Sequence, residues 1–136
     1  MTPDIETNIL TKLGEIFALY PDIQAVYLFG SVAAGTERPD SDLDLALVPR
    51  SNALRRQKLE ILTDLVRAGF DSTDLVILDT PDLVLQYEAV RHNRIIYQTA
   101  DFEASTYFSI VVRKYLDFLP FLDVQRQAYK RRILNG

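Results

Sequence analysis

The chain has 136 residues, a formal net charge of −4, 48% hydrophobic residues and 25% charged residues, which is the composition of a folded globular domain. The acidic balance argues against nucleic-acid backbone binding as the main activity, so no direct nucleic-acid partner is expected. The chain has no cysteine, which excludes a disulfide framework, a thiolate metal site and a cysteine nucleophile. The N-terminal segment is not a signal peptide, and no run approaches the ~20 apolar residues that cross a bilayer. We therefore expect a cytoplasmic protein with no membrane contact.

Cap and turn signals divide the first part of the chain. Thr2-Pro3-Asp4 predicts a helix start, and apolar residues at helical spacing follow it up to Pro21. The apolar run 26–29 predicts a strand that stops at Gly30-Ser31, and residues 42–48 predict the next strand.

Pro49-Arg50-Ser51 predicts the start of a second amphipathic helix, which is expected to stop at Gly69. Its expected buried stripe is Leu54, Leu59, Leu62, Leu65 and Val66.

The rest of the chain predicts a strand over residues 74–78, a helix after Thr80-Pro81-Asp82 and a short edge strand over residues 94–97. From Asp101 the pattern is helical, and Pro120 is expected to break or kink it. The fold class is α/β (α+β), with a mixed sheet flanked by helices. We expect a core over residues 1–98 and a helical extension over residues 99–136 that packs on it, as a single domain.

The predicted extension is rich in aromatic residues: Phe102, Tyr107, Phe108, Tyr115, Phe118 and Phe121. Filling of the core is the simpler interpretation, and a protein–protein surface is the alternative. The basic side chains at its end, Arg126, Lys130, Arg131 and Arg132, fit a solvated helix face. They could also dock an acidic partner or an RNA-bound complex.

Two aspartates open the second predicted strand. Because side chains alternate along a strand, Asp42 and Asp44 lie on one face of it. Neighbouring carboxylates repel each other unless a cation lies between them, and Mg²⁺ prefers oxygen ligands and keeps positions open for substrate phosphates. The pair therefore predicts a metal site, although Asp42 could simply cap the loop and Asp44 could lie on a solvated face.

Gly30 and Ser31 form a turn that can receive an anion. A glycine lets backbone N–H groups approach a phosphate closely, and the serine hydroxyl adds a donor. The dipeptide alone is common, so it is evidence for a phosphate-binding turn only together with the aspartates that follow in the sequence.

Gly30-Ser31, ten intervening residues and Asp42-Leu43-Asp44 resemble the signature of the DNA polymerase β-type nucleotidyltransferases. The shortness of the chain is similar to the minimal nucleotidyltransferases, which are typically antitoxins found beside helical HEPN ribonuclease toxins. The resemblance covers residues up to about 98. It implies the polymerase β-type fold, and transfer of a nucleoside monophosphate from a triphosphate to an acceptor hydroxyl.

The resemblance also implies roles for residues. Asp42 and Asp44 would hold two Mg²⁺ ions, and Asp74 matches the family's third carboxylate, which binds the catalytic metal and helps to deprotonate the acceptor. Gly30 and Ser31 would grip the β- and γ-phosphates of the nucleotide.

Two further candidates for nucleotide binding lie in the same loop. Ser41 is one, although shaping the loop is the simpler role for it. Relatives often carry a basic residue directly after the Gly-Ser pair, whereas this chain is neutral there; Arg38 is the nearest cation, and Arg55 or Arg56 could reach from the following helix.

The leading hypothesis is an antitoxin that acts as a Mg²⁺-dependent protein adenylyltransferase. It would transfer AMP from ATP to a tyrosine hydroxyl of a cognate HEPN toxin, and both the acceptor and ATP come from the resemblance. One alternative is a non-catalytic antitoxin that blocks the toxin by stoichiometric binding. Such a scaffold would have no use for clustered acids. A small-molecule nucleotidyltransferase is a third possibility, weakened by the lack of a second domain to enclose its substrate.

Overall fold

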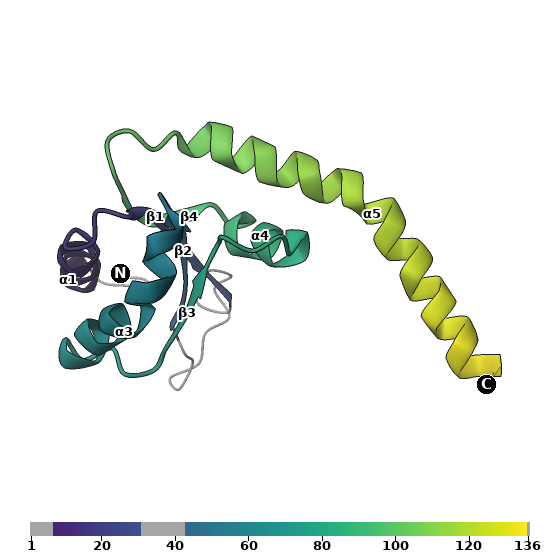
Figure 1. The fold of residues 1–136 in the computed structure, drawn as a ribbon, viewed down its shortest axis with the longest axis horizontal. Helices are drawn as coiled ribbons and strands as arrows, with labels where there is room; N and C mark the ends of the chain where they lie inside the picture. The colour runs from purple at the N-terminus through teal and green to yellow at the C-terminus, as the bar shows by residue number, and fades with distance from the viewer. Residues whose placement is uncertain (1–6, 31–42, 136) are drawn as a thin grey trace.

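A mixed four-stranded sheet forms the centre of the computed structural model, which describes residues 7–30 and 43–135 (Figure 1). The strands are β1 (Ile23–Phe29), β2 (Leu43–Pro49), β3 (Thr73–Ile77) and β4 (Arg94–Gln98), in the spatial order β3-β2-β1-β4. β1 is antiparallel to both β2 and β4, whereas β2 and β3 are parallel. The sheet and the edge position of β4 confirm the predicted fold class. The division into residues 1–98 and 99–136 stays a prediction.

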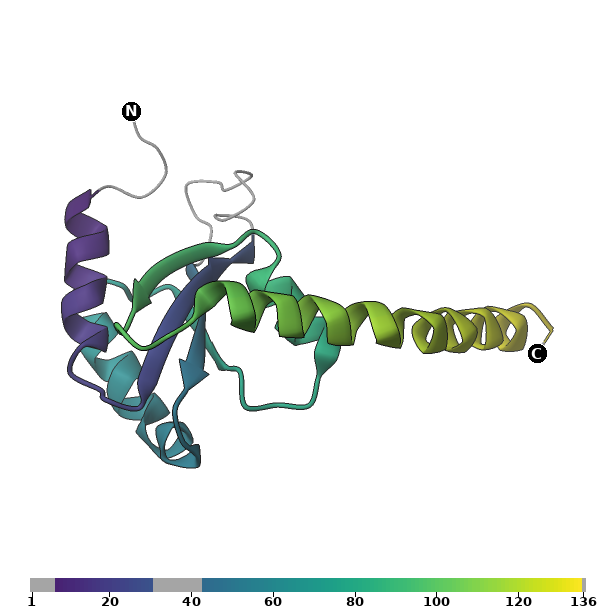
Figure 2. The same cartoon turned by 90° about the horizontal axis from the view of Figure 1, so that it is seen from above.

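Helices cover both faces of the sheet. They are α1 (Thr7–Phe17), the 3₁₀ helix η1 (Asn52–Gln57), α3 (Lys58–Arg67), α4 (Leu83–Val90) and α5 (Ala104–Asn135). α1 and α3 lie on one side, and α4 with the first part of α5 lies on the other (Figures 1 and 2). η1 and α3 form the crossover that lets β2 and β3 run parallel.

The alternation of side chains along the strands divides the core in two. Leu45 and Leu47 of β2 face α1 and α3, where they pack with Phe17 and Leu65. Their neighbour Ala46 faces the opposite side, towards α4 and α5. Each strand therefore contributes to two apolar layers, as expected for a sheet covered on both faces.

The predicted buried stripe of the second helix is partly wrong. Leu54 and Leu65 are fully buried, but Leu59 is 77% exposed and Val66 is 53% exposed, while Ile61 is buried in their place. The segment begins as the 3₁₀ helix η1, which turns through about 120° per residue instead of 100°. A constant helical period counted from Leu54 nevertheless selects Ile61 and Leu65, which follow it at seven and eleven residues and are buried. Leu59 and Val66 do not share that face, so the predicted stripe was wrong where it departed from the helical period.

Other local predictions are confirmed. α4 begins directly after the predicted start signal, although its cap is Asp82, which accepts a hydrogen bond from the backbone N–H of Leu85 at 3.1 Å, and not the hydroxyl of Thr80. Gly69 follows the end of α3 with a φ of +99°. α5 continues through Pro120 without a break and bends part-way along its length (Figure 1), as expected when proline removes one helical hydrogen bond.

No helix in the described ranges is both long and apolar enough to cross a membrane. The cytoplasmic location stays a prediction.

The aromatic residues of α5 divide between the core and the surface. Tyr107 stacks on Tyr27 of β1 with ring centroids 6.1 Å apart, and Tyr115 stacks on Tyr87 of α4 at 4.0 Å. Phe121, by contrast, is 66% exposed. Filling of the core therefore accounts for the first half of the extension and not for the second.

We expect Tyr27→Phe to leave the unfolding free energy unchanged or to raise it by about 1 kcal/mol, because an unpaired buried hydroxyl is costly. The Tyr27 side chain is fully buried, and its hydroxyl has no hydrogen-bond partner among the described residues. Urea denaturation at pH 7 checks this, and a loss of more than 1 kcal/mol would contradict it.

A second prediction concerns alkaline pH. Burial raises the pKa of Tyr27 from 10.0 to about 12, so the folded state favours the protonated hydroxyl. This contribution to the unfolding free energy is complete below pH 10 and is lost between pH 10 and 12. In that range the tyrosine ionises in the unfolded chain but not in the folded one, so the unfolding free energy falls by about 1.4 kcal/mol per pH unit. Tyr27→Phe should flatten this decline in the unfolding free energy, whereas Tyr129→Phe, at an exposed position, should not.

Candidate active site

Two carboxylates lie side by side where β2 and β3 begin. In the parallel register of these strands, Asp44 is the direct partner of Asp74. Partners in a parallel pair project from the same face of the sheet, here the face that carries Ala46 and Val76 towards α4 and α5. Asp44 is half-buried and Asp74 is exposed, so the pair lies open to solvent at one end of the sheet.

Gly30 follows β1 directly and lies against the carboxylate of Asp44. A Cβ on Gly30 would lie 2.0 Å from Oδ2 of Asp44, closer than any real contact, and the backbone φ of Gly30 is +76°. Phe29, the residue before it, pairs with Asp44 across β1 and β2. The glycine is therefore required twice, once by the left-handed backbone and once by the side chain that fills the space of its missing Cβ.

The structure thus brings together three of the predicted site residues, Gly30, Asp44 and Asp74, from three strand ends. The other predicted site residues, Ser31, Arg38, Ser41 and Asp42, lie outside the described residues.

Two arginines in the described ranges lie away from the carboxylate pair. Arg55 donates to Asp79 at 2.9 Å and holds the pKa of that carboxyl below its usual range. Asp79 follows the far end of β3, so Arg55 is committed to a partner at the other end of that strand from Asp74. Arg94, at the start of β4, pairs with Leu28 and lies at the same end of the sheet as Gly30. Leu28 projects towards α1 and α3, which places Arg94 on the face opposite the carboxylates. The position of Arg94 depends on the pairing of β4 with β1, which local sequence patterns do not encode.

The donor set fits a hard divalent cation. Neighbouring carboxylates with the same orientation supply the oxygen ligands that Mg²⁺ prefers, and the open position of Asp74 leaves room for further oxygen ligands from a substrate. Within residues 7–30 and 43–135, no group of three or more histidine, aspartate or glutamate side chains is placed to hold a metal. Any third carboxylate must come from the rest of the chain, where the sequence places Asp42.

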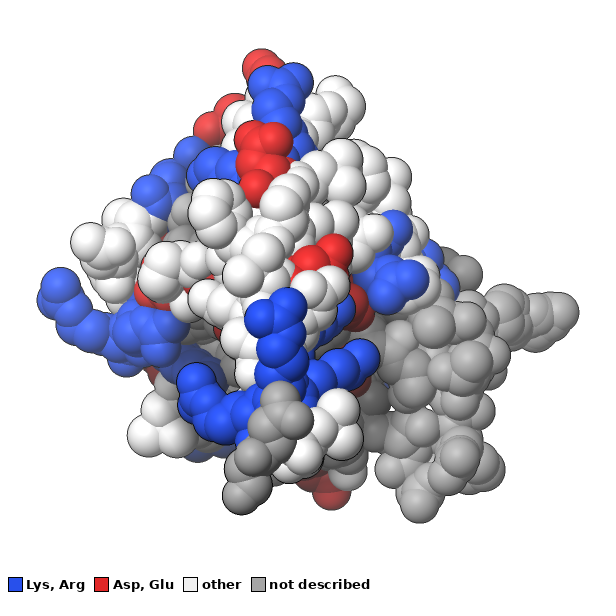
Figure 3. Space-filling model, turned by 90° about the vertical axis from the view of Figure 1, so that its right-hand side faces the viewer, with Lys and Arg blue, Asp and Glu red and all other residues white. Residues whose placement is uncertain are grey.

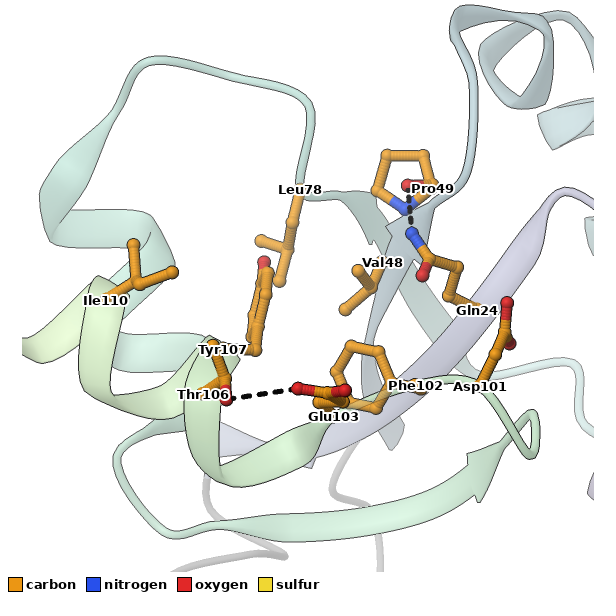
Figure 4. Close-up of a pocket in the computed structure, with 10 residues that line it drawn as sticks. All are labelled: Gln24, Val48, Pro49, Leu78, Asp101, Phe102, Glu103, Thr106, Tyr107 and Ile110. Carbon is orange, nitrogen blue, oxygen red and sulfur yellow. Dashed lines mark hydrogen bonds between the residues drawn. The ribbon is translucent and has the colours of Figure 1, made fainter.

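A separate hollow of about 320 Å³ lies at the opposite end of β1 and β2 (Figure 4). Its lining residues are Gln24, Val48, Pro49, Leu78, Asp101, Phe102, Glu103, Thr106, Tyr107 and Ile110. Two of its lining residues are charged: Asp101 is paired with Arg50 at 2.8 Å, which holds the pKa of Asp101 far below its usual range, and Glu103 accepts a hydrogen bond from Thr106 at 3.4 Å. Because Asp44 and Asp74 lie at the other end of their strands, this hollow is separate from the carboxylate pair.

Known proteins match the part of the chain that contains the whole sheet. The family model "Polymerase beta, Nucleotidyltransferase" matches residues 11–102, which include Gly30, Asp44 and Asp74. The chain is 28% identical over 108 residues to the protein adenylyltransferase MntA of Shewanella oneidensis, covering 79% of this chain and 74% of that protein.

Solved structures of similar fold are toxin–antitoxin complexes. One, determined with AMP-PNP, is 23% identical, covers 92% of this chain and 98% of its own, and superposes with a TM-score of 0.68. A mutant MntA toxin–antitoxin complex is 26% identical over 96% of this chain and 98% of its own, with a TM-score of 0.67. A complex of a tri-AMPylated HEPN toxin of Shewanella oneidensis with MNT antitoxin contains a chain that is 22% identical, covers 91% of this chain and 97% of its own, and superposes with a TM-score of 0.60.

We expect Gly30→Ala to lower the unfolding free energy by more than Gly69→Ala. Both glycines have positive φ, which costs a non-glycine residue about 1 kcal/mol or more. Only the Cβ at residue 30 would also collide with a carboxylate, because nothing lies within 4 Å of a Cβ at residue 69. Urea denaturation of the two variants measures the difference, and equal losses would contradict the close contact between Gly30 and Asp44.

Proposed function

Because the chain belongs to the polymerase beta nucleotidyltransferase family, we propose that it is an antitoxin that adenylylates its toxin. The acceptor is a tyrosine hydroxyl of a HEPN ribonuclease toxin, and the donor is ATP. The observation that carries the proposal is the register of β2 and β3, which places Asp44 beside Asp74 with Gly30 against the Asp44 carboxylate.

The reaction needs a base, and it needs the acceptor oxygen in line with the leaving group. The acceptor oxygen attacks the α-phosphorus of ATP, the bond from that phosphorus to the bridging oxygen of the β-phosphate breaks, and pyrophosphate leaves. The proton of the acceptor hydroxyl passes to a carboxylate, and Asp74 suits this role because it is the exposed member of the pair.

Asp44, half-buried against Gly30, is held in one place and suits the role of a fixed metal ligand. Together with Asp42 and Asp74 it would hold Mg²⁺, in two ions by our proposal, which when bound neutralises charge on the phosphates and on the entering and leaving oxygens. Gly30 and Ser31 would hold the β- and γ-phosphates, with Ser41 and Arg38 as further contacts.

The choice of a protein acceptor is supported by the relatives. The similar protein from Shewanella oneidensis is named a protein adenylyltransferase, and a HEPN toxin in one complex of the same fold carries AMP groups. The hollow described above lies at the other end of β1 and β2 from the carboxylates, so it does not supply a small-molecule pocket next to them. A macromolecular acceptor that brings its own hydroxyl to an open site is consistent with this arrangement.

The direct test is transfer of label. Purified chain, α-³²P-ATP and Mg²⁺ are incubated with the HEPN protein encoded beside it. We expect label on that protein, a loss of at least 100-fold in rate for Asp44→Asn and for Asp74→Asn, and an unchanged rate for the control Asp22→Asn. The expected loss corresponds to about 2.7 kcal/mol of transition-state stabilisation.

A particular result would refute the catalytic proposal. If no label appears on the partner, and an Asp44→Asn/Asp74→Asn double variant still neutralises the toxin as well as the wild type does, inhibition by binding alone is the correct account.

Metal dependence is a separate prediction. Removal of divalent ions with EDTA should abolish transfer, and Mg²⁺ should restore it. Because Asp44→Asn removes a ligand charge, the Mg²⁺ concentration for half-maximal residual activity should rise about tenfold or more. A titration of rate against free Mg²⁺ measures this, and a variant with the wild-type midpoint would show that Asp44 does not bind the metal.

A further inference from the structure

The face of α5 that packs on the core continues beyond the end of the core. Val111 is buried against the sheet and Tyr115 stacks on Tyr87 of α4. Phe118 and Leu122, the next residues on this face, are half-buried. Their spacing alternates between four and three residues, which keeps them on one side of a helix. The far part of α5 runs past the sheet and α4 with nothing of the described chain beside it (Figures 1 and 2), and residues 123–134 are all exposed.

The same face remains apolar in the part that projects. Tyr129 and Ile133 follow Leu122 at seven and eleven residues, and they are 62% and 60% exposed. Leu122, Gln125, Arg126, Tyr129 and Lys130 line a hollow of about 280 Å³ along this side of the helix. We call residues 122–133 on this side of α5 the distal face.

The projecting part of α5 gains no stability from packing on the rest of the described chain. Every described side chain from residue 123 to residue 134 is exposed, so no tertiary contact supports the last turns. Isolated helices of fewer than about 12–15 residues are marginal in water, because helices in proteins gain most of their stability from a packed apolar face. The distal face therefore has the length and the pattern of a helix that completes its packing against another molecule.

The charge of this segment selects the kind of partner. Residues 123–135 contain four basic side chains and one acidic side chain, in a protein whose net charge is −4. Lys and Arg side chains gather on the side of the molecule towards which this end of α5 points (Figure 3). Parallel pairing with a second copy would bring the basic side chains of both helices together, which opposes self-association. The matching surface is an apolar groove bordered by aspartate or glutamate.

We infer that the distal face is the docking helix for the HEPN toxin of the proposed function, and this inference rests on that function. The apolar row Leu122, Tyr129 and Ile133 lies in a groove of the toxin, and Arg126 and Lys130 pair with acidic side chains at its border. This is recognition of an amphipathic helix by a groove, with anchors spaced by helical turns. Docking through a projecting helix leaves the end of the sheet that carries Asp44 and Asp74 open to the acceptor.

The test compares matched pairs of substitutions on two sides of the same helix. Tyr129→Ser/Ile133→Ser removes two exposed apolar side chains from the distal face, and Val124→Ser/Leu134→Ser removes two from other sides, where Val124 is 66% and Leu134 is 82% exposed. The probe is the purified HEPN protein encoded beside this chain, and calorimetry gives the Kd. We expect the first variant to raise Kd by about tenfold or more and the second to leave it within about twofold.

The charged border is tested in the same way. Arg126→Glu on the distal face should weaken binding and reduce its dependence on salt, whereas Arg131→Glu on the opposite side should do neither. Circular dichroism and thermal unfolding verify that all variants retain the fold.

The outcomes separate this inference from the proposed function. An Asp44→Asn/Asp74→Asn variant should bind with the wild-type Kd and transfer no label, so transfer can fail while the docking helix stands. Equal Kd values for the two double variants would overturn the inference, as would absence of binding by the wild type. A change in the molecular mass of the free chain on Tyr129→Ser/Ile133→Ser would assign the face to a second copy instead. Displacement of the toxin by single-stranded RNA would assign it to nucleic acid.

Discussion

The repulsion between two carboxylates at one end of the sheet is the constraint on which the site depends. Asp44 and Asp74 are direct partners in the register of β2 and β3, so neither can move away without breaking strand pairing. Two like charges on neighbouring strands favour a divalent cation between them. The sheet places Gly30, Asp44 and Asp74 together before any ligand arrives, which is the kind of pre-organisation that would lower the cost of catalysis.

The backbone at Gly30 also helps to place the carboxylate of Asp44. Its positive φ lets the chain leave β1, and its missing Cβ leaves the space that an oxygen of Asp44 occupies. In the sequence this glycine suggests only an approach of backbone to phosphate. In the structure it also seats a carboxylate, and that second role follows from the antiparallel pairing of Phe29 with Asp44, which no local pattern encodes.

Much of the fold could be predicted because its signals are local. Proline, glycine and capping residues mark most of the helix ends, and α4 starts directly after Thr80-Pro81-Asp82, although Asp82 caps it and not Thr80. The partnership of Asp44 with Asp74 was implied by family resemblance and became specific only with the strand register. The buried stripe of η1 and α3 was partly wrong because Leu59 and Val66 do not share a helical face with Leu54, whereas Ile61 does. Arg94 was passed over because its position beside β1 depends on a long-range pairing. The extent of α5 beyond the core also depends on where the other elements end.

The most direct measurement is anomalous diffraction from crystals of this chain grown with Mn²⁺ and a non-hydrolysable ATP analogue. The account predicts a Mn²⁺ peak at coordination distance, about 2.0–2.2 Å, from the carboxylate oxygens of both Asp44 and Asp74, with the triphosphate beside Gly30. Nucleotide bound elsewhere, or a metal held without either aspartate, would contradict it.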